Sequence, residues 1–262
     1  MIKGFRYYRS YFQRKKLFRD SGLTPDDVFI VSYPKSGNTW VRFLVANALF
    51  PGKELTLRNL HELLPTVQES TAASLRALPS PRFIKTHGAF FSLYPRSVYI
   101  TRDYRDVIVS AFHHFKNRNQ FDGDLSAFVR SGKINRFGPW HWHIAEALHW
   151  KEKHPERIHF VRYEDLKSDT EKEVRALLEF CGISPSVPVT EIITASSFEK
   201  LRNIEEQAGG KLRDSSGNFF FRKGEAGGWK NVLTKEDEAV LLSDPHTKKM
   251  MLALGYAIST ER

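Results

Sequence analysis

Residues 33–40, with the sequence YPKSGNTW, combine a lysine and a glycine with several hydroxyl and amide side chains. They follow the apolar run 28–31 and precede the apolar segment 41–49, which predicts a buried strand, a tight loop and a helix. Such a loop can direct backbone N–H groups, a lysine ammonium and the positive end of a helix dipole at one anion. These residues therefore predict a binding site for a phosphorylated or sulfated molecule.

Three further groups of residues suit the same chemistry. Arg102 is followed eight residues later by Ser110, and the two side chains can donate hydrogen bonds to one phosphate. The glycine-rich stretch 221–231, FRKGEAGGWKN, has two adjacent cations and the character of a loop that closes over an anion. His87, in the sequence KTH, is a natural proton acceptor, because the unperturbed pKa of histidine is about 6.5.

Each of these groups also has a simpler structural interpretation. Arg102 could pair with Asp103 or Asp106, and the cations of the glycine-rich stretch could lie on a solvated turn. His87 could be a hydrogen-bonded residue at the end of a strand. The interpretation as one site depends on the elements that bring the groups together.

Apolar runs that end in polar residues predict strands at 82–86, 97–101 and 158–163, besides 28–31. Helical patterns follow residue 102 and cover 171–180, where Gly182 ends the helix. Strands that alternate with helices predict an α/β fold with a central parallel sheet and helices on both faces. Ligands of such sheets bind at the carboxyl ends of the strands, where we expect Lys35, His87, Arg102 and Tyr163 to converge.

Together these motifs resemble those of the soluble, cytosolic-type sulfotransferases that use 3′-phosphoadenosine-5′-phosphosulfate (PAPS). The elements YEDL at 163–166 and SSFE at 196–199 add to the resemblance, which spans residues 33–231 in the order of the family. It implies a P-loop-like nucleotide-binding fold. It also implies in-line transfer of a sulfo group from PAPS to a hydroxyl or amine of a small-molecule acceptor, which leaves 3′,5′-adenosine bisphosphate (PAP).

The resemblance assigns roles to individual residues. His87 would be the general base, Lys35 would neutralise the leaving oxygen with help from Lys85, and Ser110 would restrain Lys35 until an acceptor binds. Trp40 and Phe198 would enclose the purine, because aromatic rings stack well on a flat base. The residues expected to bind the nucleotide are Lys35, Ser36, Gly37, Asn38, Thr39, Trp40, Arg102, Ser110, Tyr163, Ser196, Phe198, Arg222, Lys223 and Gly224.

The chain departs from the pattern of the family at two places. Gly228 stands where the family usually has an aspartate before the tryptophan, which we expect to loosen the glycine-rich loop. The dimerisation pattern after that tryptophan keeps Lys230 and Thr234 but not its later residues, so the oligomeric state stays open. No metal is expected, because lysines and loop amides would take the place that magnesium has in kinases.

Two other functions remain open. A P-loop kinase would need the order G-x-x-x-x-G-K-[ST], which this chain lacks. A non-catalytic nucleotide- or nucleic-acid-binding protein would suit the net charge of +10. The Lys and Arg residues are, however, spread over the chain without a known nucleic-acid-binding pattern, so we expect no nucleic acid partner.

Composition predicts a single domain over residues 1–262 in the cytoplasm. The one cysteine, Cys181, excludes an internal disulfide, and no apolar run reaches the ~18 residues of a membrane span. The basic, aromatic segment 1–20 could touch anionic lipid, but a helix packed across its own domain is favoured. The acceptor is expected among the connections 51–81, 115–142 and 207–220, which offer both aromatic and polar candidates. These candidates are Phe90, Phe91, Phe137, Trp140, Trp142, Phe219, Phe220, Arg136, His141 and His143.

Overall fold

A four-stranded parallel sheet forms the centre of the computed structural model, in the order β2-β1-β3-β4. The structure describes residues 2–207 and 224–258, apart from the side chains of residues 2–9. The strands are β1 (Val28–Ser32), β2 (Phe83–Thr86), β3 (Arg96–Thr101) and β4 (Ile158–Arg162). All of β1 is buried, as expected of a central parallel strand that is covered on both faces.

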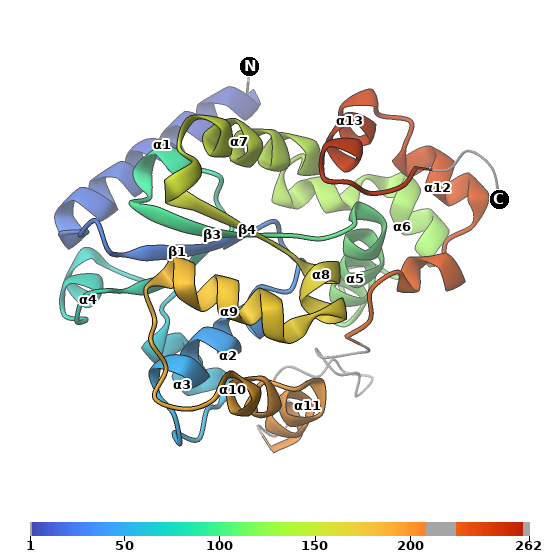
Figure 1. Ribbon diagram of the computed structural model, residues 1–262. Coiled ribbons are helices and arrows are strands. Elements are labelled where there is room, and N and C mark those ends of the chain that lie inside the picture. The colour runs from blue at the N-terminus through green and yellow to red at the C-terminus, as the bar shows by residue number, and fades with distance from the viewer. Residues whose placement is uncertain (1, 208–223, 259–262) are drawn as a thin grey trace.

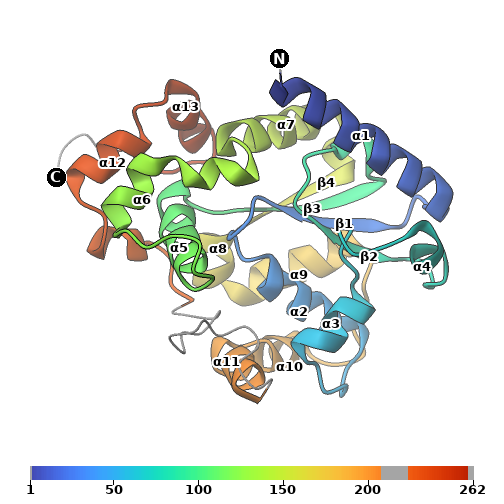
Figure 2. The same ribbon diagram turned by 180° about the vertical axis from the view of Figure 1, so that it is seen from behind.

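Helices cover both faces of the sheet, which confirms the predicted α/β fold (Figures 1 and 2). One layer holds α1 (Ile2–Ser21), α5 (Tyr104–Lys116), α6 (Leu125–Ser131), α7 (Trp140–Lys153), α12 (Lys235–Leu241) and α13 (Pro245–Ala253). The other holds α2 (Asn38–Leu49), α3 (Leu57–Leu63), α8 (Tyr163–Ser168), α9 (Thr170–Cys181), α10 (Val189–Ala195) and α11 (Phe198–Gln207). Shorter elements are α4 (Ala72–Arg76) and the 3₁₀ turns η1 (Phe91–Leu93), η2 (Lys133–Phe137), η3 (Pro155–Arg157) and η4 (Gly228–Asn231).

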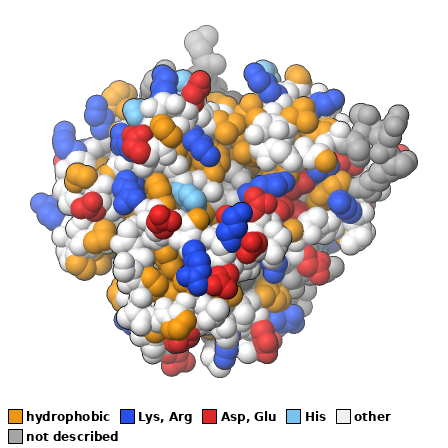
Figure 3. Space-filling view, viewed as in Figure 1, with side chains coloured by type: hydrophobic (Ala, Val, Ile, Leu, Met, Phe, Trp, Pro, Cys, Tyr) orange, Lys and Arg blue, Asp and Glu red, His pale blue; other side chains and the backbone are white. Residues whose placement is uncertain are grey.

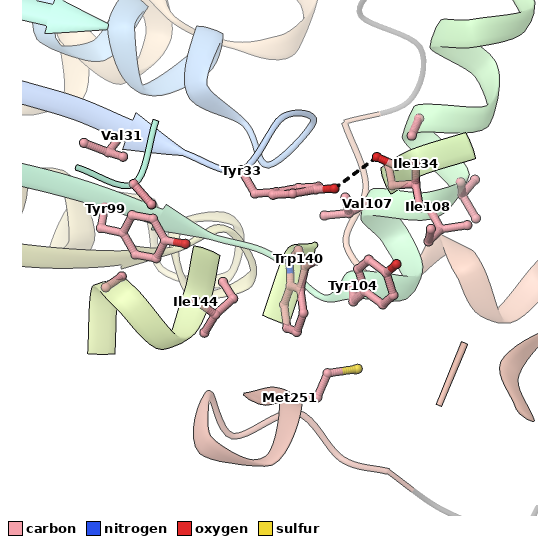
Figure 4. Packing of buried hydrophobic residues seen from close by; sticks show 14 of the residues in the cluster. Val31, Tyr33, Tyr99, Tyr104, Val107, Ile108, Ile134, Trp140, Ile144 and Met251 are labelled. Atoms are coloured by element: carbon pink, nitrogen blue, oxygen red, sulfur yellow. Dashed lines mark hydrogen bonds between the residues drawn. The ribbon is translucent and has the colours of Figure 1, made fainter. Parts of the chain in front are cut away.

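Two hydrophobic cores lie on opposite faces of the sheet. Side chains alternate along β1, so that Phe29 and Val31 belong to the core under α1, α5 and α7, whereas Val28 and Ile30 belong to the core under α2 and α9. Figure 4 shows part of the first core, where the Tyr33 hydroxyl donates to the carbonyl of Ile134. This bond fixes the chain just where β1 passes into the loop 33–37.

The C-terminal half of α1 packs on its own domain. Phe18 is buried, with its ring centroid 5.0 Å from that of Phe29, and Arg14 donates to the carbonyl of Val67. The buried guanidinium of Arg82 ties the end of the helix to the sheet, because it donates to the Ser21 carbonyl at 3.0 Å and also contacts Asp27 at 2.6 Å. This half of α1 therefore has the predicted packed arrangement. Among the described residues, no helix has the length and apolarity that a membrane crossing requires.

The connection between α3 and α4 covers the edge of β2. Lys85 donates its N–H to Pro65 and accepts from Val67, which sets Thr66 beside Lys85 as in a parallel strand. The predicted variable segment 51–81 thus contains two short helices and an extended piece that adjoins the strand carrying Lys85.

Candidate active site

A cavity of about 1250 Å³ opens at the carboxyl ends of β1, β2 and β3. This is the edge at which parallel α/β sheets bind ligands. The structure brings together twelve of the residues expected from the sequence. The cavity is lined by Lys35, Gly37, Asn38, Thr39, Trp40, Lys85, His87, Arg102, Ser110, Tyr163, Phe198 and Gly224.

The loop between β1 and α2 is shaped like an anion-binding turn. Lys35 and Gly37 both have left-handed backbones, with φ of 74° and 98°. A Cβ atom on Gly37 would lie only 2.6 Å from Cδ2 of Tyr163, so only glycine fits here. Ser36 Oγ is buried and has no hydrogen-bond partner among the described residues, which suits a hydroxyl that meets a ligand.

Asn38 closes the loop against the strand. Its side-chain amide donates to the Ile30 carbonyl and to Ser32 Oγ, both at 3.2 Å. The first turn of α2, with its unsatisfied N–H groups, is therefore held directly above the end of β1.

Two lysines at the cavity carry altered proton affinities. Burial, with the nearby charges of Arg102 and Arg118, lowers the pKa of Lys35 to about 7. Burial, with the nearby charge of Arg42, lowers the pKa of Lys85 to about 8. Both lysines are therefore poised to gain stabilisation from an anion, since a bound negative charge favours the protonated form.

His87 is fixed in one tautomer by the end of β1. Its Nδ1 lies 2.8 Å from the Ser32 carbonyl oxygen. A carbonyl can only accept, so Nδ1 carries the proton and Nε2 keeps its lone pair. Burial and the charge of Lys85 lower the pKa of His87 to about 3, which keeps the imidazole neutral.

A buried pair beneath the cavity supports the backbone of His87. His143 Nε2 donates to the His87 carbonyl at 3.3 Å, and the Tyr99 hydroxyl lies 2.7 Å from His143 Nδ1. His143, which the sequence suggested for the acceptor pocket, is instead only 4% exposed and packs in the core.

Arg102 joins the loop after β1 to the C-terminal loop. Its guanidinium donates to the carbonyls of Lys35 at 3.3 Å and of Glu225 at 2.9 Å, and it lies 4.3 Å from the ring centroid of Tyr163. These contacts hold the guanidinium flat over the ring, with Nε buried and without a partner among the described residues. The alternative pairing with Asp106 is only a 4.0 Å contact.

Asp106 anchors the glycine-rich loop. Its two carboxylate oxygens accept from the backbone N–H groups of Gly227 at 2.7 Å and Trp229 at 2.9 Å. The loop is thus held from α5, although Gly228 lacks the side chain that the family usually has there. No sequence pattern indicates this role for Asp106.

A family model described as the sulfotransferase domain matches residues 25–250. The chain belongs to the sulfotransferase family. Cytosolic sulfotransferase 12 of Arabidopsis thaliana is 35% identical over 238 residues, which cover 80% of this chain and 73% of the relative. Sulfotransferase 1A1 of Mus musculus is 27% identical over an alignment of 282 positions, which covers 97% of this chain and 94% of the relative.

The fold is also that of a solved structure. The crystal structure of retinol dehydratase in complex with androsterone and the inactive cofactor PAP aligns with a TM-score of 0.69 at 24% identity. The alignment covers 93% of this chain and 85% of the other. The protein described here is accordingly a sulfotransferase with the P-loop-like α/β fold.

The other residues of this sulfotransferase that were predicted to bind the nucleotide either pack beside aromatic rings, are buried, or lie outside the described part of the chain. Trp40 and Tyr163 meet edge to face with ring centroids 5.7 Å apart, and Gly224 fits against Phe198, where a Cβ atom would come within 2.5 Å of the ring. Ser196 is fully buried and accepts a hydrogen bond from Asn47. The predicted ligands Arg222 and Lys223 lie outside the described residues.

The residues suggested for the acceptor pocket lie in different places, and two of them, Phe219 and Phe220, lie outside the described residues. Phe137 lines the sulfotransferase cavity, whereas Phe91 and Trp140 are buried in the core. His114 also lines it, one turn after Ser110 on α5; from the sequence alone this histidine could be a surface, acceptor-pocket or packing residue. The described residues contain no cluster of three His, Cys, Asp or Glu side chains that could hold a metal ion.

Proposed function

We propose that this sulfotransferase moves the sulfo group of PAPS in line to a hydroxyl or amine of a small-molecule acceptor, with His87 as the general base. The observation that carries the proposal is the hydrogen bond of His87 Nδ1 with the Ser32 carbonyl, 2.8 Å long. It leaves the lone pair of Nε2 available at a cavity that Lys35 and Lys85 also line. The names of the plant relatives support the cytoplasm as the site of action.

The residues present fit a nucleotide with phosphate at both ends. The unpartnered hydroxyl of Ser36 and the N-terminus of α2 suit the 5′ group, and Arg102 with Ser110 suits the 3′-phosphate. Trp40 and Phe198 would bracket the base. When bound, PAPS supplies the activated sulfo group, and Arg222 and Lys223 are proposed as further phosphate ligands.

The side chains around the transfer point have separate tasks. His87 Nε2 would take the proton of the acceptor hydroxyl, while the ammonium groups of Lys35 and Lys85 would stabilise negative charge on the phosphate side. Ser110 is proposed to restrain Lys35. The negative charge of the donor would raise the pKa of His87 from its low value in the free protein toward that of a working base.

The cavity is better suited to binding a small molecule than the surface is to binding a nucleic acid. Figure 3 shows Lys and Arg side chains interspersed with Asp and Glu over the face that it presents. Such a mixture gives a weaker field for a polyanion than a continuous basic patch would give.

Two measurements test the proposal. Calorimetry without magnesium should show tighter binding of PAP than of ADP, and mass spectrometry should detect a sulfo group on an acceptor incubated with PAPS. Preference for ADP with magnesium would instead indicate a kinase. Binding of PAP without transfer to any phenol, alcohol, sugar or amine would indicate a non-catalytic binding protein.

A further inference from the structure

One wall of the cavity consists of polar side chains that adjoin the reacting end. Lys85 and His87 are two residues apart on an extended chain, so their side chains point to the same side. Thr66 pairs with Lys85 in the backbone bridge, and Gln68 follows Thr66 by two residues. All four line the cavity. The segment after α3 therefore continues the row of side chains that begins with the proposed base.

This wall offers both hydrogen-bond donors and acceptors. The Thr66 hydroxyl donates to Oε1 of Gln68 at 2.7 Å, which orients the amide and leaves its NH₂ group to donate elsewhere. Glu69, next in the chain, places its carboxylate 3.5 Å from Nδ1 of His61 at the mouth of the cavity. The Glu69 side chain is 69% exposed, so one of its oxygens can accept hydrogen bonds from a ligand.

The facing wall comes from α5 and carries another neutral polar group. His114 lies one helical turn after Ser110 and lines the cavity. Burial and the charge of Lys35 lower the pKa of His114 to about 3, so its ring stays neutral and has one donor and one acceptor nitrogen. The ring of Phe137 lies 6.4 Å from that of His114, between centroids, and adds an apolar surface at the same side.

Resting on the proposed function, we infer that the acceptor is a neutral polyhydroxylated molecule such as a sugar or glycoside. The amide of Gln68, the carboxylate of Glu69 and the imidazole of His114 match several hydroxyl groups at once, and Phe137 matches the C–H face of a ring. An apolar acceptor would cover these groups without replacing their hydrogen bonds to water. Because Glu69 and Lys85 bring charges of both signs to this wall, neither an anionic nor a cationic acceptor gains a net attraction there.

The inference is tested by competition among acceptors. The purified protein with PAPS is offered methyl glucoside, methyl galactoside and a disaccharide glycoside, and in parallel 4-nitrophenol and a hydroxysteroid. Mass spectrometry of the sulfated products should show at least a tenfold higher kcat/KM for one of the sugars than for the phenol or the steroid. Transfer to no sugar, or faster transfer to the phenol or the steroid, would overturn the inference.

Two variants test whether this wall recognises the acceptor. Glu69→Gln should raise KM for the preferred sugar about tenfold with little change in kcat, whereas Glu62→Gln on the same connection serves as the exposed control. His114→Phe should reduce kcat/KM for the sugar about tenfold or more and increase it for 4-nitrophenol. An unchanged ratio of the two acceptors in both variants would count against this wall as the acceptor site.

Failure of the inference can be told apart from failure of the proposed function. Calorimetric binding of PAP and transfer to any acceptor support the proposed function alone. If PAP binds and the phenol or the steroid is sulfated in preference to every sugar, only the acceptor class is wrong. If PAP does not bind, the proposed function itself fails.

Discussion

The two sides of the cavity are built in different ways. The proposed nucleotide side consists of strand ends and of the loop before α2, where Asn38 and Arg102 donate to backbone carbonyls and Gly37 fits against the ring of Tyr163. The acceptor side comes from the connection after α3 and from the outer turns of α5, and Gln68, Glu69 and Arg118 are exposed there. Donor recognition is thus part of the fold, whereas acceptor recognition depends on side chains that can change without disturbing the sheet.

The largest effect is expected where the two sides meet. His87→Ala should reduce kcat by about 10²–10⁴-fold, because a positioned base contributes that much, while PAP affinity changes less than threefold. Steady-state kinetics and calorimetry measure the two quantities, with the exposed His149→Ala as the matched control. Wild-type turnover in the variant would remove His87 from the mechanism, and a parallel loss of PAP affinity would show that the two sides are not separable.

A change on the nucleotide side should act on binding instead. Arg102→Lys keeps the charge but loses the planar fork, so PAP affinity should fall about 10- to 100-fold. AMP, which lacks the 3′-phosphate, should bind with nearly its original affinity. Calorimetry with PAP and with AMP measures the change in each affinity, and Arg175→Lys on the exposed face of α9 is the control. Equal losses for PAP and AMP would place Arg102 away from the 3′-phosphate.

The rigidity of the nucleotide side can be tested with two glycines that share a left-handed backbone. Gly182→Ala should cost about 1–2 kcal/mol, because φ is 68° and no atom lies within 4 Å of the added Cβ. Gly37→Ala should cost about 1–3 kcal/mol more, since the Cβ would also meet Tyr163 at 2.6 Å. Urea unfolding measures both. Equal losses of stability would mean that the loop 33–37 adapts to a side chain as readily as an ordinary helix end does.

The smallest expected effect is on proton uptake. With a pKa of about 7 for Lys35 and about 8 for Lys85, Lys35 is largely deprotonated and Lys85 is about half deprotonated at pH 8, so PAP must restore protons to bind well. PAP affinity should therefore fall by up to about tenfold between pH 7 and 8. Calorimetry at pH 8 in buffers of different ionisation enthalpy should show proton uptake that Lys35→Met largely removes.

The lowered pKa of Lys35 also determines whether the stability of the nucleotide-free protein rises or falls with pH. The ordinary pKa of lysine is 10.5, so between about pH 7 and that value the unfolded state binds more protons at Lys35 than the folded state does. The contribution of Lys35 to the free energy of unfolding should therefore rise with pH over this window. A fall of that contribution, measured as the difference between wild type and Lys35→Met, would contradict the lowered pKa.

The sequence predicted the strand ends that line the cavity on the proposed nucleotide side better than the segments on the proposed acceptor side, for physical reasons. Buried strands are continuous apolar runs, so the ends that carry Lys35, His87 and Arg102 could be located from hydrophobicity. The bond of His87 with the Ser32 carbonyl and the anchoring of Gly227 by Asp106 join residues far apart in the chain. No local pattern indicates such contacts.

The acceptor wall was only partly predictable. The connection 51–81 was expected to vary, but its pairing with β2 depends on backbone hydrogen bonds of Lys85 that the side chains do not encode. His114 could not be assigned to the pocket from the sequence alone, because its neighbour His113 and the adjacent phenylalanines are equally consistent with ordinary helix packing. Phe91 and Trp140 were wrongly suggested for the pocket, because aromatic residues near a site are as well suited to a core.

The position of Trp40 gives the protein a built-in optical reporter. All five tryptophans lie in the described part of the chain, and of these only Trp40 lines the cavity, with Tyr163 beside it. A purine stacked on its indole would quench that emission, while the other four would contribute a constant background. Nucleotide occupancy could therefore be followed in real time by intrinsic fluorescence, without a label.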